Sequence, residues 1–349
     1  MIELSSEKVE SGQDAQGRDV LENLIYKLDA QSLHNLLKDH STGRNIRWAT
    51  RDYIHTGIKG YGEWDNITVN SIIRSHGYVI QPRVDKTPEE QRLRSVEKAE
   101  VFTPSWVCNA QNNLVDAAWF NRKNAGFNKE LSAGNPRWKT IKTPIKFTKS
   151  KSWQEYVKAP RLEISCGEAP YLTCRYDTVS GLYIQPPDRI GFLDRKLRVV
   201  TENTSTEEEW IEWALNAVKA TYGFEYQGDS LLIARENLLF AVKEYFEYVF
   251  KKPISLEFFR ECSVIISWNV WQMDGLKFVV PGTCHSETEP QRDLFDMPSP
   301  IKMCLGCKTG DISKHNGVRC RIMDWGNNEM VYFKPPFKFE PITKESIDE

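Results

Sequence analysis

The chain has 349 residues, 40% of them apolar, so it is long enough to bury a full-size hydrophobic core. Its 46 Lys and Arg against 48 Asp and Glu give a formal net charge of -2, so the overall charge does not by itself demand a nucleic-acid partner. We expect neither a membrane span nor a secretory signal nor a membrane partner, because no apolar run of about 18 residues and no charged start before an apolar block occurs. The expected location is the cytoplasm.

The N-terminal region, residues 1–85, is predicted to be mixed and largely helical. After a polar, acidic beginning, leucines recur at helical spacing from Asp19 to about Asp39. A second helix is predicted from Thr87-Pro88 to about Ala99, since a Thr before Pro and two acids is typical of a helix start.

The middle region, residues 86–280, alternates strand and helix patterns. Strand-like runs begin at Leu162 and occupy 222–227 and 263–271. A helix is expected from a Ser205 and Glu208 capping box to Gly223, and another over 231–250. This order predicts an α/β fold with a parallel sheet and crossover helices.

A basic insertion covers residues 131–154, where six cations and no acids are interleaved with three large aromatic residues. Cations beside aromatics are typical of a surface that contacts phosphates, so these side chains are our candidates for DNA contact. The alternative is a solvated insertion whose charges are simply unpaired. The six candidates are Arg137, Lys139, Lys142, Lys146, Lys149 and Lys151.

Four short segments carry the strongest functional pattern. The first is Glu100–Pro104, whose Thr103-Pro104 also suits an ordinary helix start. In the second, a strand ends at Cys166-Gly167-Glu168, where a glycine lets the backbone pass close to a ligand and the next helix offers free N–H groups. Glycine turns after strands are also common in α/β proteins without such a ligand.

The third and fourth segments follow the next two strands and each supplies an acid. Glu225, at a strand end, has the chemistry to accept hydrogen bonds from both hydroxyls of a ribose, or it caps the next helix. Asp274-Gly275 follows the last strand-like run, where apolar neighbours are expected to flank a planar base.

In this order the four segments resemble the adenine DNA amino-methyltransferases of bacterial restriction-modification systems, more narrowly proteins named restriction endonuclease subunit M, over residues 80–325. The resemblance implies a Rossmann-like S-adenosylmethionine-dependent methyltransferase sheet over 86–280. Phe102 and Thr103 would cover the methionine end of the cofactor, and Asp274 would accept its adenine amino group. Ala169 stands where the family has a second glycine. The implied cofactor-binding residues are Phe102, Thr103, Pro104, Glu163, Cys166, Gly167, Glu168, Glu225 and Asp274.

The chain departs from the family at the catalytic motif. Transfer to an exocyclic amine in this family uses Asn-Pro-Pro-Tyr, in which the Asn and a backbone carbonyl accept the amine hydrogens and the ring stacks on the flipped base. The nearest string here is Lys334-Pro335-Pro336-Phe337, and a charged lysine has no acceptor. We expect a second chain to carry the motif, together with a restriction subunit; a truncated coding sequence or a lost reaction are the alternatives.

The C-terminal region, residues 281–349, is rich in cysteine. Cys304, Cys307, His315 and Cys320 supply four ligands within 17 residues, as a structural zinc knuckle requires. The pair Cys284-His285 is able to replace one of them, and a set of buried thiols without metal is the other interpretation.

Two further functions are alternatives to methyl transfer. A non-enzymatic DNA- or protein-binding adaptor would use the basic insertion and the zinc segment without a cofactor. A nuclease is suggested by Pro187-Asp188 and Asp194-Arg195-Lys196, although such strings arise easily in a chain with 27% charged residues.

Overall fold

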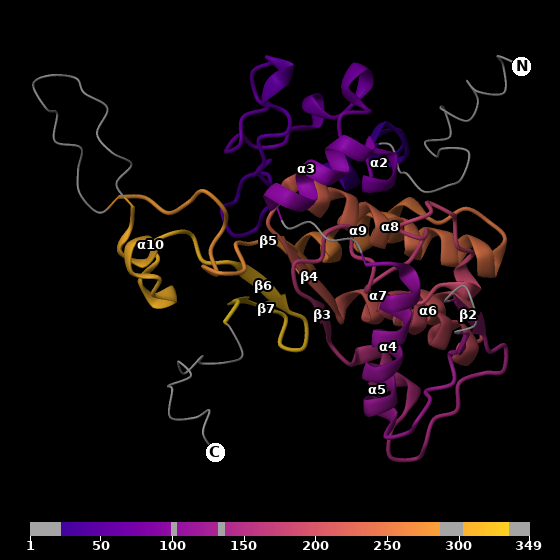
Figure 1. Cartoon of the computed structure of the whole chain (residues 1–349). Helices are drawn as coiled ribbons and strands as arrows, with labels where there is room; N and C mark the ends of the chain where they lie inside the picture. The colour runs from indigo at the N-terminus through magenta and orange to yellow at the C-terminus, as the bar shows by residue number, and fades with distance from the viewer. Residues whose placement is uncertain (1–21, 99–102, 132–136, 287–302, 335–349) are drawn as a thin grey trace, which may run out of the picture.

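The computed structural model describes residues 22–98, 103–131, 137–286 and 303–334 (Figure 1). At its centre lies a parallel sheet of three strands in the order β3 (Arg161–Glu163), β4 (Thr221–Glu225), β5 (Val270–Gln272). Each crossover runs through two helices: α6 (Phe192–Asn203) and α7 (Glu207–Lys219), then α8 (Gly228–Phe250) and α9 (Leu256–Asn269). The mixed α/β class and the parallel sheet expected from the sequence are therefore confirmed.

The other elements surround this unit. The helices are α2 (Glu22–Leu37), α3 (Pro88–Lys98), α4 (Ser105–Phe120), α5 (Trp153–Lys158) and α10 (Leu305–Thr309). Two antiparallel hairpins pair β1 (Asn128–Leu131) with β2 (Arg137–Thr140), and β6 (Arg321–Asp324) with β7 (Glu329–Tyr332). Short 3-10 helices are η1 (Ile54–Thr56), η2 (Val69–Ser71), η3 (Arg74–His76), η4 (Arg83–Asp85), η5 (Pro186–Asp188) and η6 (Ile312–Lys314). None of the described helices combines the length and the apolar composition needed to cross a bilayer.

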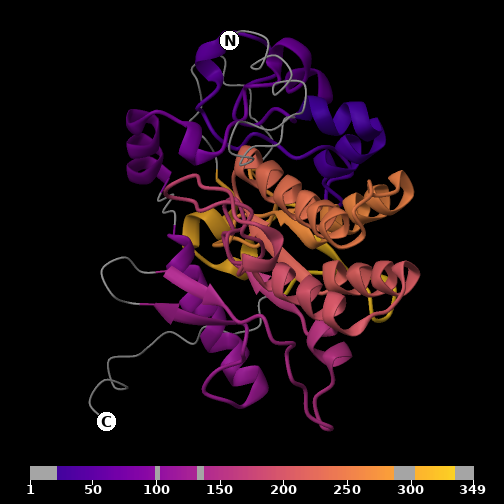
Figure 2. The same cartoon turned by 90° about the vertical axis from the view of Figure 1, so that its right-hand side faces the viewer.

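The sheet separates two apolar layers, because alternate residues of a strand face opposite sides. Figures 1 and 2 show helices α6–α9 on one side of the sheet and the β6/β7 hairpin on the other. Val270 faces the main core with the helices, whereas Phe224 and Trp271 face a smaller cluster that also contains Cys320. Phe333, directly after β7, packs on Trp271 with ring centroids 5.0 Å apart.

The N-terminal region is tied to the sheet unit through α8. Buried Arg235 donates to the carbonyls of Lys38 at 3.0 Å and Val270 at 2.7 Å, so one guanidinium joins the end of α2 to β5. Ile25 and Leu33 of α2 belong to the same core cluster as the sheet. The predicted helix over residues 19–39 is present as α2, but it is divided by a kink at Asp29, whose φ of -158° and ψ of 100° are not helical. Apolar residues of the region 22–85, such as Trp48 and Ile67, share the core of the middle region.

Three local predictions were wrong, two of them at the ends of predicted elements. The run at 263–271 is helical up to Asn269 and only then extended, because Ser255 caps α9 and the buried Ile265 and Ile266 pack in the core, which overrides β propensity. Helix α7 ends at Lys219. Gly223 is instead the third residue of β4.

The third error is the cap of α7, which is one residue later than predicted. Thr206, not Ser205, is the N-cap, and its hydroxyl accepts from the N–H of Glu209 at 3.2 Å. A pattern of Ser, Thr and three consecutive Glu allows both registers, so the sequence alone does not choose between them.

Candidate functional site

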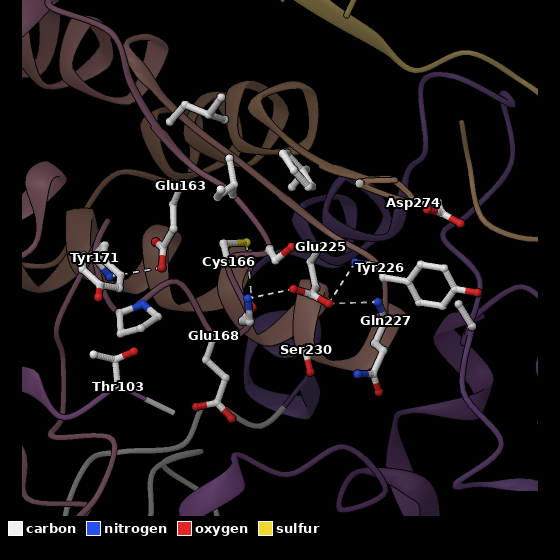
Figure 3. A pocket seen from close by; sticks show the side chains of 18 of the residues that line it. Thr103, Glu163, Cys166, Glu168, Tyr171, Glu225, Tyr226, Gln227, Ser230 and Asp274 are labelled. Atoms are coloured by element: carbon white, nitrogen blue, oxygen red, sulfur yellow. Dashed lines mark hydrogen bonds between the residues drawn. The ribbon is translucent and has the colours of Figure 1, made fainter. Parts of the chain in front are cut away.

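A cavity of about 1090 Å³ opens at the carboxyl ends of the three parallel strands (Figure 3). The segments that follow β3 (165–168), β4 (226–227) and β5 (274–276) all line it. Strands that run parallel end at the same edge of the sheet, which is why segments about 50 residues apart in sequence meet here. Residues 49–51 and Glu63 of the N-terminal region complete the wall.

Most of the residues predicted to bind a cofactor lie in this cavity. They are Thr103, Glu163, Cys166, Gly167, Glu168, Glu225 and Asp274. Phe102 lies outside the described residues, and Pro104 is the N-cap of α4 and not a lining residue. The Thr103-Pro104 segment is therefore both a helix start and, through Thr103, part of the wall. The sequence analysis missed Arg51, which no motif connects to the strand ends.

The loop after β3 has an unusual backbone. Ser165, Gly167 and Ala169 have φ values of 47°, 53° and 64°, all in the left-handed region that side chains disfavour. A Cβ added to Gly167 would meet no atom within 4 Å, so this backbone faces open space in the cavity. Ala169 thus occupies a conformation that suits glycine. Strained backbone of this kind is concentrated at functional sites.

Glu225 organises the cavity floor (Figure 3). Its carboxylate accepts from the N–H groups of Gly167 at 2.8 Å, Tyr226 at 2.9 Å and Gln227 at 3.2 Å. The side chain therefore fixes the loop after β3 against the start of α8. A carboxylate has about four acceptor positions, so room for one further donor is left.

Glu163 and Asp274 also accept hydrogen bonds from backbone N–H groups, at the two outer walls of the cavity. Glu163 accepts from the N–H of Leu172 at 3.1 Å. Asp274 accepts from the N–H groups of Leu276 at 3.0 Å and Lys277 at 3.2 Å, and the Lys277 ammonium lies 3.1 Å from its second oxygen. Each acid shapes a turn at a strand end and still lines the cavity.

The cavity lining is strongly acidic. Five acids, Glu63, Glu163, Glu168, Glu225 and Asp274, and one cation, Arg51, are among the lining residues. Two of the acids are ion-paired: Glu63 lies 3.3 Å from Arg51, and Asp274 lies 3.1 Å from Lys277. Burial raises the pKa of Glu163 well above its usual range, and burial also raises the pKa of Glu225 against the opposing effect of its three N–H donors. At a pH where these carboxyl groups are ionised, such a lining favours ligands with positive charge and hydroxyl donors, and it disfavours phosphates.

A second candidate site lies in the C-terminal segment. Cys284, Cys304, Cys307 and His315 place their ligand atoms within 4.8 Å of one another. His315 Nδ1 is 3.6 Å from Cys304 Sγ, 3.7 Å from Cys307 Sγ and 3.8 Å from Cys284 Sγ. A tetrahedral zinc ion with typical Zn–S and Zn–N bonds separates S and N ligands by about 3.6 Å, so the donor set and its spacing fit zinc.

The structure corrects the fourth predicted ligand. Cys320 is fully buried in the small cluster behind the sheet, and its thiol lies 3.5 Å from the carbonyl of Gln272. Cys284 takes the place among the ligands that the sequence analysis gave to Cys320. The sequence spacing favoured Cys320 as the fourth ligand because Cys320 follows His315 closely. Cys284 is far from the other ligands in sequence, since it precedes α10, and only the fold brings it to them.

The metal cluster adjoins the wall that carries Asp274. The N–H of Asp274 donates to Val279 at 2.9 Å, and the N–H of Val280 donates to Val318 at 2.9 Å. The N–H of Val318 in turn donates to the hydroxyl of Thr283 at 2.9 Å. Thr283 directly precedes Cys284 in the sequence. A short backbone path therefore connects the cluster to the cavity.

The candidates for DNA contact are not equivalent. Arg137, Lys139, Lys142, Lys146 and Lys149 are exposed. Lys151 is half-buried, donates to the carbonyl of Trp119 and lies over its ring, so it serves packing.

The string Lys334-Pro335-Pro336-Phe337 was the nearest match to the catalytic motif, and its one described residue does not line the cavity. Lys334 is exposed and is not a lining residue, and Pro335, Pro336 and Phe337 lie outside the described residues.

Three residues of the nuclease interpretation, Asp194, Arg195 and Lys196, have structural roles, whereas Asp188 is exposed. Asp194 accepts from the N–H of Cys174 at 2.8 Å, and Arg195 is paired with Asp116 at 2.7 Å. Lys196 is buried and donates to the carbonyls of Ala159 and Ala220, both at 2.8 Å. All three side chains are engaged inside the protein, so this string does not form an open metal site.

No protein-family model, curated protein or solved structure shows significant similarity to the chain.

Proposed function

We propose that the chain is the S-adenosylmethionine-binding subunit, or part, of a DNA adenine methyltransferase in a restriction-modification or related defence system. The single observation that carries this proposal is the shared cavity: Gly167, Glu225 and Asp274, from three strand ends, line one space. In this proposal β3, β4 and β5 form one half of a Rossmann-like methyltransferase sheet.

The chemistry of the cavity suits this ligand. S-adenosylmethionine carries a positive sulfonium and ammonium, which an acidic lining stabilises. A ribose hydroxyl would donate to the acceptor position left on Glu225, and the adenine amino group to Asp274. Tyr226 and Leu276 also line the cavity and offer apolar surface to the base. A dinucleotide or a nucleoside triphosphate would place phosphates among five acids, which is unfavourable.

The methyl acceptor would be an adenine presented by a partner. The chain has no Asn-Pro-Pro-Tyr string, and none of the described lining residues combines an amide acceptor with a following stacking ring in that arrangement. We therefore assign this motif to a second chain, which in a restriction-modification system would act beside a restriction subunit.

We further propose that the Cys284, Cys304, Cys307 and His315 cluster holds one structural zinc ion. Four protein ligands leave no open position for a reacting water, so the ion would stabilise the segment and take no part in the chemistry.

Calorimetric titration with S-adenosylmethionine tests the cavity. The proposal expects saturable binding of one equivalent, weakened about 10- to 100-fold in Asp274→Ala, since a hydrogen bond to a charged group contributes about 1.5–3 kcal/mol. Asp311→Ala is the matched control, because Asp311 also pairs with a lysine three residues on but does not line the cavity. It should bind as the unchanged protein does. An absence of heat, or equal loss in both variants, contradicts the proposal.

The adaptor function remains the second candidate, because the described residues contain no catalytic motif at the cavity. An adaptor binds DNA or protein but no methyl donor, so the same titration separates the two. Methyl transfer to DNA by this chain alone would contradict the split site while leaving the cofactor assignment intact.

A further inference from the structure

The β1/β2 hairpin has an outer face that carries only positive charge. In the antiparallel register Lys129 is directly opposite Lys139, and Arg137 lies two residues from Lys139 on the same face. All three side chains are exposed. Like charges directly opposite each other destabilise a strand pair, so this arrangement weakens the isolated hairpin and suits one that binds anions.

The acid of the hairpin is turned away from this face. Glu130 is the one acidic residue between Asn121 and Gln154, and its carboxylate accepts from the side chain of Asn113 on α4 at 2.7 Å. Its register partner Trp138 donates its indole N–H to the carbonyl of Asp188 at 2.8 Å. The inner face is thus used for packing against the protein, and the acid of the hairpin lies on the opposite face from the cations.

The hairpin is held firmly in this orientation. Buried Asn128 of β1 exchanges side-chain hydrogen bonds with Asn109 of α4 at 3.1 and 2.7 Å. Arg198 of α6 donates to the carbonyls of Phe127 at 3.0 Å and Ile141 at 2.6 Å, which closes the base of the hairpin. The outer face is therefore organised before any ligand arrives, which lowers the entropic cost of binding.

The flanking loops carry further exposed cations. Arg122, before β1, donates to the carbonyl of Lys146 at 2.7 Å, so the loop before the hairpin lies against the loop after it. The exposed cations of these loops are Arg122, Lys123, Lys142, Lys146 and Lys149.

We propose that this surface, formed by Lys129, Arg137 and Lys139 and the flanking loops, contacts the phosphate backbone of duplex DNA. The choice of DNA as partner rests on the proposed function, and the surface is the part of that function that holds the substrate. Helix α4 connects the two, because Asn109 anchors the hairpin and Gln111 lines the cavity; Figure 2 shows the hairpin beside this helix. Lys129 is not one of the DNA contacts predicted from the sequence.

Binding of a fluorescent 30-base-pair duplex, followed by anisotropy at several salt concentrations and without methyl donor, tests this surface. The triple variant Lys129→Gln, Arg137→Gln, Lys139→Gln should bind all duplex sequences more weakly. The slope of log K against log salt should become shallower by about 3, roughly one for each cation that no longer neutralises a phosphate.

The matched control removes three exposed cations elsewhere, by Lys27→Gln, Lys251→Gln and Lys252→Gln on α2 and at the end of α8. It should bind as the unchanged protein does, and thermal melting checks that both triple variants fold. Equal binding by the hairpin variant, or equal loss in the control, overturns the proposal. Hairpin-dependent binding to phosphatidylserine vesicles but not to duplex overturns it too. Failure here leaves methyl-donor binding untouched, so the two proposals fail separately.

Discussion

The strand-end cavity and the metal cluster are stabilised in different ways. The cavity walls continue from strands whose residues, such as Val270 and Trp271, are buried in apolar layers on both sides of the sheet. The cluster lies on short segments, one of which is the five-residue helix α10. Apolar residues of these segments remain largely exposed: Met303 is 53%, Leu305 42% and Ile312 40% exposed. Packing maintains the first site, whereas the proposed zinc ion would maintain the second.

This difference predicts that the two sites respond oppositely to the same treatments. A segment with little apolar burial needs a metal ion to fold, and loses structure when the ion leaves. A cavity at the edge of a buried sheet keeps its shape without ligand, but it is sensitive to any change in packing beneath it.

The largest effect is expected from metal removal. Cys304→Ser should reduce bound zinc from one equivalent to none and abolish hydrogen-exchange protection over residues 303–319, because structural zinc contributes about 10–16 kcal/mol in small zinc-binding segments. Helices α8 and α9 should keep their protection. Zinc content by mass spectrometry and exchange by peptide are the measurements.

Cys320→Ser is the matched control for this prediction. It changes a buried thiol outside the cluster, so it should lower stability yet retain one equivalent of zinc. Loss of zinc in Cys320→Ser with retention in Cys284→Ser would restore the ligand set first predicted from the sequence.

Packing beneath the cavity gives the next largest effect. A Cβ on Gly228, the first residue of α8, would lie 1.9 Å from the carbonyl oxygen of Arg47. Gly228→Ala should therefore lower the free energy of unfolding by about 3 kcal/mol. Gly326→Ala is the control, since its added atom would approach only the Asp324 side chain, at 3.2 Å. Equal denaturant midpoints for the two variants would contradict this account.

The acidic lining predicts a pH dependence of ligand affinity. Burial raises the pKa of Glu163 and of Glu225, so both bind protons at a higher pH than an exposed glutamate. A cationic ligand favours the ionised carboxylates; affinity should therefore rise with pH through their pKa values, and binding should release protons. Titrations at a series of pH values, from the ordinary pKa range of a glutamate upward, should show weaker binding at the acid end. S-adenosylhomocysteine, which lacks the sulfonium charge, should show a smaller change, and equal slopes would contradict the role of the acids.

The smallest effect concerns the backbone of the cavity loop. Ala169 has φ of 64° and a fully buried methyl group, so in Ala169→Gly the relief of strain offsets the lost burial, and the free energy of unfolding should change by less than about 0.5 kcal/mol. Ala214→Gly, in the interior of α7, loses a buried methyl group without any relief of strain and should lower the free energy of unfolding by about 2 kcal/mol. Chemical denaturation of both variants checks this difference, and an equal loss in the two would contradict it.

The sequence predicted the features that depend on local order. The alternation of strands and helices was enough to expect a parallel sheet, and strand-end residues such as Gly167, Glu225 and Asp274 were enough to expect a shared cavity. Parallel strands bring their carboxyl ends to one edge whatever lies between them, so these predictions did not require knowledge of tertiary contacts.

The features that were missed depend on contacts between distant segments. Arg51 reaches the cavity from a region without a motif, and Cys284 joins the metal cluster although Cys320 is nearer in sequence to His315. The helical conformation of Ile265 and Ile266 follows from burial against the core, which the β-branched composition of the run concealed. The position of Lys129 opposite Lys139 follows from the pairing register of the β1/β2 hairpin, which the sequence pattern did not reveal.

Ultraviolet cross-linking of tritiated S-adenosylmethionine, followed by peptide mapping, tests the location of the ligand most directly. The account predicts label on peptides that contain residues 163–171, 225–230 or 274–276, and the label should disappear when unlabelled S-adenosylhomocysteine competes. Label confined to other peptides, or label that the competitor does not displace, would contradict the assignment of the strand-end cavity as a methyl-donor site.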